Sequence, residues 1–273
     1  MIGQTELLSR ISGQISRNKF PRFSILIGEK GSGKKELAYA IAKPLNLAIT
    51  FVDTKVDTIR EVIDNAYKID LPILYVIADC DNMSSASANA LLKVTEEPPK
   101  NAYFILTCEN ADNLLQTIKS RGVTYMLEPY SYEDKCDYLD TQEKRPNETD
   151  VEFILEVASN IGEVQIMLNM DIQAFRDYAN LVVDNIAEVS GSNAFKIGEK
   201  IALKDEEDKY NLKLFWKAFN AICVDRMTTG DDPLRYARAI AITGDYSQQL
   251  NIRGINKQML FDNWLLSIRE EWL

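Results

Sequence analysis

The chain has 273 residues, of which 46% are hydrophobic, which is enough for one core domain with helical additions or for two domains. Its net charge of −10 argues against a protein that grips a nucleic-acid backbone alone, because phosphate contacts need Lys and Arg. The lack of His excludes histidine-based acid–base and nucleophilic catalysis. The charge is uneven, since residues 1–50 carry eight Lys or Arg against three Glu. That segment predicts either a basic face that meets phosphates or a merely solvated face.

The four cysteines are far apart and form no C-x-x-C pair: Cys80, Cys108, Cys136 and Cys223. A structural zinc site needs clustered Cys or His ligands, so no zinc is expected. No apolar run approaches the ~18–20 residues of a membrane span, and the N-terminus lacks the apolar run of a signal peptide. We therefore expect a soluble cytoplasmic protein with reduced thiols and no membrane partner.

The first half of the chain alternates short apolar segments with helical patterns. Five segments predict strands: 23–27, 48–52, 73–78, 102–107 and 123–127. Four segments predict helices: 33–42, 56–69, 84–95 and 112–119. Ser84 can cap the third of these helices, and Pro98 and Pro99 force its end. Strands that are apolar on both faces and separated by helices predict a parallel five-stranded sheet covered by helices on both sides.

After Pro129 only helical periodicity remains. Apolar helix faces are predicted over four segments: 153–161, with a break at Gly162, then 164–175, 214–222 and 260–268. The polar residues 140–150 predict an exposed loop, and 190–193 predict a break between helices. The sequence therefore predicts an α/β domain over 1–129, followed by all-helical material that divides near residue 175.

A glycine-rich loop follows the first predicted strand: Gly28-Glu29-Lys30-Gly31-Ser32-Gly33-Lys34-Lys35. This G-x-x-x-x-G-K pattern lies between a strand and a helix, the setting in which a P-loop binds phosphate. Its glycines let backbone N–H groups converge on phosphate oxygens, and the following helix adds its positive dipole end. Lys34 is expected to reach the β- and γ-phosphates. The alternative is a glycine turn without a ligand.

The residue after the P-loop lysine departs from the pattern. A Ser or Thr at this position supplies the hydroxyl that binds Mg²⁺. Here the residue is Lys35, whose ammonium group cannot bind a metal and would repel it. We therefore expect ATP or ADP to bind weakly or not at all, because the normal Mg²⁺–ATP geometry is lost.

Three further segments follow in order: A-N-A-L-L-K-V-T-E-E-P-P at 88–99, F-I-L-T at 104–107 and L-L-Q-T-I-K-S-R at 114–121. Together with the opening Ile2-Gly3-Gln4 and the P-loop, this series resembles the clamp-loader branch of the AAA+ ATPases. The resemblance covers residues 1–129 well and the following helices weakly. It implies a P-loop AAA+ domain over 1–129, a small helical lid over 130–175 and an all-helical oligomerisation collar over 176–273.

The resemblance also implies roles for individual residues. It places the nucleotide at Gly28, Gly31, Ser32, Gly33, Lys34, Lys35 and Thr107. It places the metal-binding Asp of the family at Ala78, which has no oxygen to offer, and the water-polarising Glu at Asp79. Gln165 stands where the family carries an Arg that reaches the γ-phosphate. Arg121 of the Ser120-Arg121 pair is implied to act in trans, as a catalytic arginine finger in the nucleotide site of a neighbouring subunit.

Because the metal ligands and the lid Arg are missing, the chain resembles the delta-prime subunit of the bacterial DNA polymerase III clamp loader rather than its motor subunits. The resemblance implies a poor or inactive ATPase that joins motor subunits and a delta subunit in a ring. It further implies that the chain meets the sliding clamp and primer–template DNA through that complex. The C-terminal helices would form the collar, although their aromatic residues fit ordinary core packing better.

Two other functions stay open at this point. The first is an active clamp-loader ATPase, in which Asp79 or Asp81 holds Mg²⁺ in a shifted geometry. The second is a helper protein of a phage or mobile element that uses the clamp-loader architecture. For Arg121 the alternative is an ordinary surface salt bridge. Three further charged residues have i, i+3 and i+4 spacing, which simple support of a helix explains: Lys93, Glu96 and Glu97.

Overall fold

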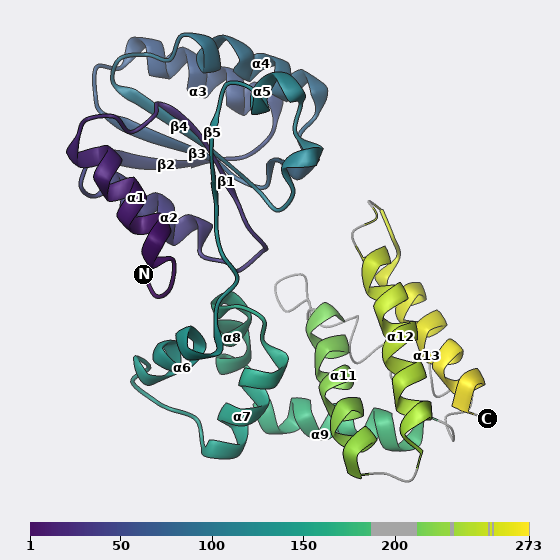
Figure 1. Ribbon diagram of the computed structural model, residues 1–273. Helices are drawn as coiled ribbons and strands as arrows, with labels where there is room; N and C mark the ends of the chain where they lie inside the picture. Colours follow the sequence, from purple (N-terminus) through teal and green to yellow (C-terminus); the bar gives the residue numbers. More distant parts are fainter. Residues whose placement is uncertain (187–211, 230–231, 251, 253, 273) are drawn as a thin grey trace. The chain divides into compact units, whose positions relative to one another are not determined.

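A computed structural model describes residues 1–186, 212–229, 232–250, 252 and 254–272 (Figure 1). The chain divides into two compact units. The first, here called the α/β unit, contains Met1–Thr141 together with Asn160–Gly162. The second, here called the helical unit, contains Gln142–Ser159 and Glu163–Leu273. The predicted helix break at 190–193 lies outside the described residues, and the division into three domains stays a prediction.

The α/β unit is built on a parallel five-stranded sheet with the strand order β2-β3-β4-β1-β5. Its strands are β1 (Phe23–Ile27), β2 (Ala48–Val52), β3 (Ile73–Ile77), β4 (Ala102–Cys108) and β5 (Val123–Met126). β1 lies between β4 and β5, with Ile25 opposite Leu106 on one side and Thr124 on the other. Parallel strands are usually joined by crossover helices, which is why the alternating sequence pattern leads to this sheet. The predicted fold class is confirmed.

Helices cover both faces of the sheet (Figure 1). One face carries α3 (Val56–Lys68), α4 (Ser85–Glu96) and α5 (Gln116–Lys119), and the other carries α1 (Thr5–Ser16) and α2 (Lys34–Ala42). Each layer encloses its own apolar core, because successive side chains of a strand point to opposite faces. Three short elements complete the unit: η1 (Cys80–Asn82), η2 (Ala111–Asn113) and α6 (Tyr132–Asp140).

The two edge strands differ from the buried strands that the sequence predicts. β1 is buried throughout, and β4 almost throughout. β2 and β5 each bury one residue, Val52 and Tyr125 respectively. An edge strand has a neighbour on one side only, so its apolar side chains are not fully enclosed. The expectation of strands buried on both faces is therefore wrong at the sheet edges.

Local signals set the helix ends in this unit. The Ser84 hydroxyl accepts a hydrogen bond from the Ser87 N–H at 3.1 Å, which confirms the predicted cap of α4. The helix predicted over 112–119 is shorter than expected, because the chain first forms the η2 turn and only then α5. In η2 the Asn110 side chain accepts from the Asp112 N–H at 2.8 Å, a local contact that competes with a regular helix start.

The helical unit contains α7 (Glu148–Val157), most of α8 (Ile161–Leu168), α9 (Ile172–Asn185), α11 (Leu212–Thr229), α12 (Pro233–Gln249) and α13 (Lys257–Trp272). The apolar faces predicted over 214–222 and 260–268 are confirmed as buried faces of α11 and α13. α12 is not predicted by the sequence pattern. Its buried residues are Ala239 and Thr243, so it contributes few side chains to the core.

Two predicted helix faces need correction. Gly162 lies inside α8 and does not end a helix, because the break comes earlier, where Ala158 adopts an extended backbone conformation. The apolar pattern over 164–175 belongs to two helices, since α8 ends at Leu168 and α9 begins at Ile172. The predicted division near residue 175 falls within α9.

Aromatic side chains fill the core of the helical unit. The ring of Trp264 on α13 lies 4.9 Å from Phe219 and 5.7 Å from Trp216, both on α11. The indole N–H of Trp264 donates a hydrogen bond to the Thr243 hydroxyl on α12 at 2.9 Å. One buried tryptophan therefore joins three helices, and these aromatic residues serve as core.

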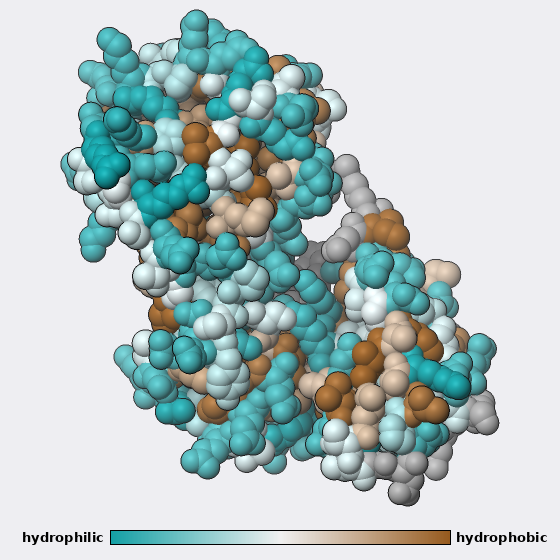
Figure 2. Space-filling model, viewed as in Figure 1, coloured by the Kyte–Doolittle hydropathy of each residue, from teal (hydrophilic) through white to brown (hydrophobic). Residues whose placement is uncertain are grey.

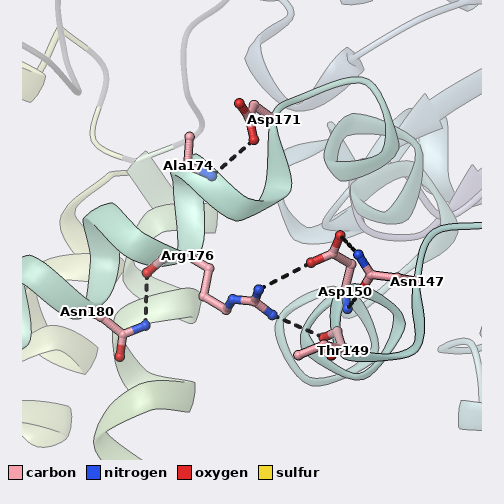
Figure 3. Close-up of polar contacts among 7 residues, drawn as sticks. All are labelled: Asn147, Thr149, Asp150, Asp171, Ala174, Arg176 and Asn180. Atoms are coloured by element: carbon pink, nitrogen blue, oxygen red, sulfur yellow. Dashed lines mark hydrogen bonds and ion pairs between the residues drawn. The ribbon is translucent and has the colours of Figure 1, made fainter.

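A polar cluster joins α7 and α9 (Figure 3). Arg176 on α9 forms an ion pair with Asp150 at 3.4 Å and donates a hydrogen bond to the Thr149 carbonyl at 3.3 Å. Asn147 caps α7 by accepting from the Asp150 N–H at 2.8 Å. The guanidinium group also lies over the Phe153 ring, 5.8 Å from its centroid. These contacts fix the first turn of α7 against α9.

Hydrophobic residues form small patches among hydrophilic ones on the face drawn in Figure 2. Among the described helices, none combines the length and the apolar character needed to cross a membrane. The four cysteines are free thiols. Burial raises the pKa of the Cys108 thiol to about 11 and that of Cys223 to about 12.

Candidate functional site

The glycine-rich loop lies between β1 and α2, as predicted. The Gly28 N–H donates to the Cys108 carbonyl at the end of β4, at 3.1 Å, so the loop leaves the sheet beside β4. Gly31 and Gly33 have φ angles of 88° and 89°, in the left-handed region that favours glycine. The Ser32 hydroxyl is buried without a hydrogen-bond partner among the described residues. A buried unpaired donor in a glycine-rich turn fits a phosphate oxygen.

Residues from distant parts of the chain hold this loop. The Tyr130 hydroxyl donates to the Ser32 carbonyl at 3.0 Å, the Asn160 amide donates to the Lys30 carbonyl at 3.1 Å, and the Gly162 N–H donates to the Gly31 carbonyl at 3.1 Å. A Cβ atom on Gly162 would overlap the Gly31 backbone. Sequence reasoning missed Tyr130 and Asn160, because no spacing pattern links them to the loop.

Lys34 is turned back onto its own loop. Its ammonium group donates to the Gly28 carbonyl at 2.5 Å and to the Glu29 carbonyl at 2.9 Å. Burial lowers its pKa, and the charges of three carboxylates oppose that shift: Glu109, Asp79 and Asp81. The cation that the sequence assigns to the β- and γ-phosphates is therefore already satisfied by carbonyls and surrounded by acids.

Lys35 does not contribute to the loop. Its side chain is exposed, and its ammonium group lies 5.7 Å from the centroid of the Phe51 ring on β2. A hydroxyl at this position would be needed to bind Mg²⁺, and Lys35 offers neither an oxygen atom nor the right charge.

The second acidic site is equally incomplete. Ala78 follows β3 and supplies no ligand, and Asp79 adopts a left-handed conformation with φ 54°. The Asp79 N–H donates to the Thr107 hydroxyl at 3.2 Å, which ties the ends of β3 and β4 together. Thr107 is therefore a structural acceptor for its neighbour, and its expected contact with nucleotide stays a prediction. The donor set fits the phosphates of a nucleotide better than it fits a metal ion.

Asp81 has a structural role. Its carboxylate accepts hydrogen bonds from the backbone N–H groups of Glu109, at 2.9 Å, and Asn110, at 2.9 Å. These contacts fix the segment after β4 and direct the lone pairs of Asp81 toward the protein. Among the described residues, no group of three or more Cys, Asp or Glu is arranged to hold a metal ion. Sequence reasoning also missed Glu109, the acid with the largest charge effect on the pKa of Lys34.

Arg121 lies after α5, on the opposite face of the sheet from α2. One guanidinium nitrogen donates to the Thr117 carbonyl at 2.8 Å, and another contacts the Glu96 carboxylate at 2.5 Å. The Arg121 side chain is 33% exposed and the Glu96 side chain 55% exposed. Both interactions point the guanidinium along the surface between α4 and α5, within reach of solvent.

The residue after Arg121 is glycine for a packing reason. A Cβ atom on Gly122 would come within 2.8 Å of Ile25 and 2.9 Å of Phe23, both on β1. Contacts closer than about 3.0 Å are not found for real Cβ atoms, so a side chain here would have to displace the side chains of Ile25 and Phe23. Gly122 thus lets the chain turn from α5 into β5 while Arg121 stays at the surface.

The charged residues of α4 near Arg121 contact neighbouring helices. Glu96 pairs with Arg121, and the Lys93 ammonium lies 5.2 Å from the centroid of the Tyr67 ring on α3. The Tyr67 hydroxyl donates to the Glu97 carbonyl at 2.8 Å. These contacts join α4 to α3 and to α5. Gln165, the residue expected on the lid helix, is exposed on α8 in the helical unit.

Comparison with known proteins finds relatives that are named as subunits of DNA polymerase III. A family model described as "DNA polymerase III, delta subunit" matches residues 47–131. The chain is 26% identical to a DNA polymerase III subunit gamma from Buchnera aphidicola, over 92% of this chain and 79% of that protein. It is 27% identical to DNA polymerase III subunit tau/gamma from Haemophilus influenzae, over 71% of this chain and 33% of that protein.

An archaeal relative extends the comparison. Replication factor C small subunit from Saccharolobus solfataricus is 24% identical over 70% of this chain and 62% of that protein. The chain spans from one third to four fifths of the length of these relatives. A crystal structure of a DNA polymerase III gamma subunit-related protein from Thermotoga maritima shares the fold, with a TM-score of 0.59 and 15% identity over 96% of this chain and 99% of that one. The comparisons support a clamp-loader member of the AAA+ proteins.

Proposed function

We propose that this chain is a clamp-loader subunit of the delta-prime kind, which supplies Arg121 in trans to the nucleotide site of a neighbouring ATPase subunit. The contrast between two cations carries the proposal. Lys34 is held by carbonyls within its own loop, whereas Arg121 lies at the surface with one third of its side chain exposed. Arg121 is therefore available to a neighbouring subunit, whereas Lys34, the cation that the chain's own pocket would need, is held by its own loop.

The chain's own pocket is expected to be a poor ATPase. The loop can cradle phosphate oxygens through its glycines and the Ser32 hydroxyl. Mg²⁺ would need oxygen ligands at the positions of Lys35 and Ala78, and neither residue has one. Without the metal, the charge that develops on the transferred phosphoryl group is not neutralised. Nucleotide, if bound, would therefore stay intact and have a structural role.

Arg121 suits a role in trans because of how it is held. The Thr117 carbonyl and the Glu96 carboxylate orient the guanidinium without burying it. An exposed ion pair of this kind contributes only about 0–1 kcal/mol, so a phosphate group can displace Glu96 at low cost. A charge placed on the transition state of phosphoryl transfer raises the rate by roughly 10³–10⁵. The expected partners are motor ATPase subunits and a delta subunit in a ring, with the sliding clamp and primer–template DNA reached through the complex.

The test is ATP hydrolysis by a reconstituted assembly of this chain with candidate motor subunits, delta subunit, clamp and primed DNA. Arg121→Ala is expected to lower the rate while assembly, followed by gel filtration, is unchanged. Lys119→Ala is the matched control, since Lys119 is a nearby, partly buried cation paired with Asp112 at 3.4 Å. An unchanged rate in Arg121→Ala with intact assembly would argue against the proposal.

The alternative of an active ATPase makes a different prediction for the isolated chain. It requires Mg²⁺-dependent turnover that disappears in Lys34→Ala. The engagement of Asp81 with two backbone N–H groups speaks against it, because a carboxylate in that position has little freedom to bind Mg²⁺. The phage or mobile-element alternative predicts that the chain co-purifies with a host clamp loader in place of one of its subunits.

A further inference from the structure

The free edge of β2 presents backbone hydrogen-bonding groups. The Ala48 N–H donates to the Pro72 carbonyl at 3.0 Å, and the Val52 carbonyl accepts from Ala78 at 3.2 Å, so both of these β2 residues face β3. Successive residues of a strand direct their backbone groups to opposite sides. The N–H and C=O groups of Ile49 and Phe51 therefore face away from β3. β2 is the last strand on this side of the sheet, so within the described chain no strand covers this edge.

An exposed aromatic pair lies beside this edge. Tyr39 on α2 and Phe51 on β2 have ring centroids 5.6 Å apart, tilted by 56°. Tyr39 is 54% exposed and Phe51 38% exposed. Two large exposed rings leave much apolar area in contact with water. Covering this area with a partner is favourable, so the pair marks a candidate binding surface. The other edge strand, β5, exposes Val123 and Met126 and lacks an aromatic side chain among its exposed residues.

Two lysines flank the aromatic pair. Lys35, Tyr39 and Lys43 follow each other at intervals of four along α2, so they share one exposed face of the helix. Lys35 and Lys43 form no ion pair within the part of the chain that the structure describes. The neighbouring acid on the helix, Glu36, lies beside Gly33 and Tyr130. Burial raises the pKa of the Tyr130 phenol to about 12, and the charge of Glu36 adds to that shift.

The acidic residue that follows β2 forms an ion pair. Asp53 pairs with Lys55 at 3.6 Å. The surface beside β2 is therefore positively charged, although the whole chain carries a net charge of −10. A partner of opposite charge is favoured here, both in its approach and in its final contacts.

We propose that this surface, here called the β2 edge surface and formed by Lys35, Tyr39, Lys43, Ile49 and Phe51, binds an extended acidic segment of another protein by strand addition. The backbone of the segment would pair with Ile49 and Phe51, an apolar side chain would cover the aromatic pair, and carboxylates would meet the two lysines. This is a second binding surface, separate from Arg121, and it goes beyond the function proposed above.

Other occupants fit less well. A nucleic-acid strand could meet the two lysines with its phosphates, but it offers no backbone that pairs with the N–H and C=O groups of Ile49 and Phe51. A second copy of this chain would bring its own two lysines against these two, and like charges repel. The observations therefore favour a peptide that alternates acidic and apolar residues, since alternate side chains of a strand point the same way.

The test uses the full chain and a fluorescein-labelled synthetic peptide in which Glu alternates with Val around one central Phe. Fluorescence anisotropy is expected to show saturable binding that weakens with salt. A peptide with Lys in place of each Glu should bind at least about tenfold more weakly, because it meets like charge. The double variant Tyr39→Ala/Phe51→Ala should lose roughly tenfold in affinity, since aromatic anchors dominate small interfaces.

A charge swap gives the sharpest readout. Lys35→Glu/Lys43→Glu should reverse the preference, so that the Lys peptide binds better than the Glu peptide. Lys93→Glu and Met126→Ala are matched controls: the first changes another exposed lysine over a tyrosine ring, and the second changes the other edge strand. Both should leave the affinity unchanged. Circular dichroism melts confirm that each variant is folded.

Amide hydrogen exchange separates strand addition from simple docking. Bound peptide should slow exchange at the amides of Ile49 and Phe51, because these N–H groups gain partners. The proposal is overturned if these amides exchange equally fast with and without peptide, or if the charge swap does not change the preference. Binding of oligothymidylate that is lost in Tyr39→Ala/Phe51→Ala, without peptide binding, would also overturn it and identify a nucleic-acid surface.

Discussion

Two ion pairs with similar contact distances lie in different regions of the molecule. In the α/β unit, Arg121 approaches Glu96 to 2.5 Å; in the helical unit, Lys217 on α11 approaches Glu163 on α8 to 2.7 Å. The Arg121 and Glu96 side chains are 33% and 55% exposed, whereas those of Lys217 and Glu163 are 22% and 6% exposed. The Lys217 ammonium also contacts the Ser159 hydroxyl at 2.8 Å. Burial, and not contact distance, separates the two pairs.

The difference in burial assigns different roles. A buried carboxylate that loses its partner pays the full cost of desolvation, so Glu163 and Lys217 hold α8 against α11. An exposed pair is nearly neutral in energy, because water competes for both partners. Arg121 is therefore free to leave Glu96 for a phosphate group, while Lys217 is not free to leave Glu163. Lys34 resembles the buried case, since carbonyl groups of its own loop already hold it.

The largest stability effect is expected for Lys217→Ala. The Glu163 carboxylate would stay buried and keep the Ser159 N–H but lose the Lys217 ammonium, which should cost about 3–5 kcal/mol in the free energy of unfolding. Urea denaturation followed by tryptophan fluorescence checks this, because Trp216 and Trp264 lie in the core of the same unit. The double variant Glu163→Leu/Lys217→Met is the control, since replacing both partners should recover most of the loss. A loss below about 1 kcal/mol in Lys217→Ala would contradict the assignment of a buried structural pair.

A smaller effect is expected for Thr243→Val. The substitution keeps the shape of the side chain and removes the hydroxyl that accepts from the Trp264 indole at 2.9 Å. An unpaired buried N–H group should cost about 1–3 kcal/mol, measured by the same urea titration. Thr243→Ser keeps the hydroxyl and should retain the hydrogen bond. Equal stability of the Val variant and the original chain would show that Trp264 does not depend on this bond.

The smallest stability effect is expected for Arg121→Ala. Its exposed pair with Glu96 should contribute about 0–1 kcal/mol, so the midpoint of thermal unfolding should shift little. Comparison with Lys217→Ala in one thermal series tests whether the two pairs differ as their burial indicates. If Arg121→Ala destabilises the chain as strongly as Lys217→Ala, then Arg121 has a structural role and its availability to a neighbour is in doubt.

The fold could be predicted from the sequence where local signals and burial agree. The central strands are continuous apolar runs, and a sheet buried on both faces requires such runs. The same logic failed at β2 and β5, because a strand's place at the edge depends on its neighbours and not on its own residues. α12 was also missed, and it buries only Ala239 and Thr243 among the residues that the structure describes.

The candidate site could be predicted only in part. The spacing of the P-loop and its missing metal ligands are visible in the sequence, because each is a local pattern of residue types. The residues that hold the loop, Tyr130 and Asn160, are not visible, since tertiary structure alone brings them to it. The roles of Asp81 and Glu109 also depend on the ends of β3 and β4 lying side by side, and residue spacing in the sequence does not predict that.

The most direct test of the account compares Lys34→Ala with Arg121→Ala in one reconstituted assembly. Single-turnover ATP hydrolysis at the neighbouring motor site is measured for each variant after assembly has been verified. The account predicts that Arg121→Ala slows this step by roughly 10³-fold or more, while Lys34→Ala leaves it unchanged. A slowed reaction in Lys34→Ala and a normal one in Arg121→Ala would contradict it, because the chain's own pocket would then be the working site.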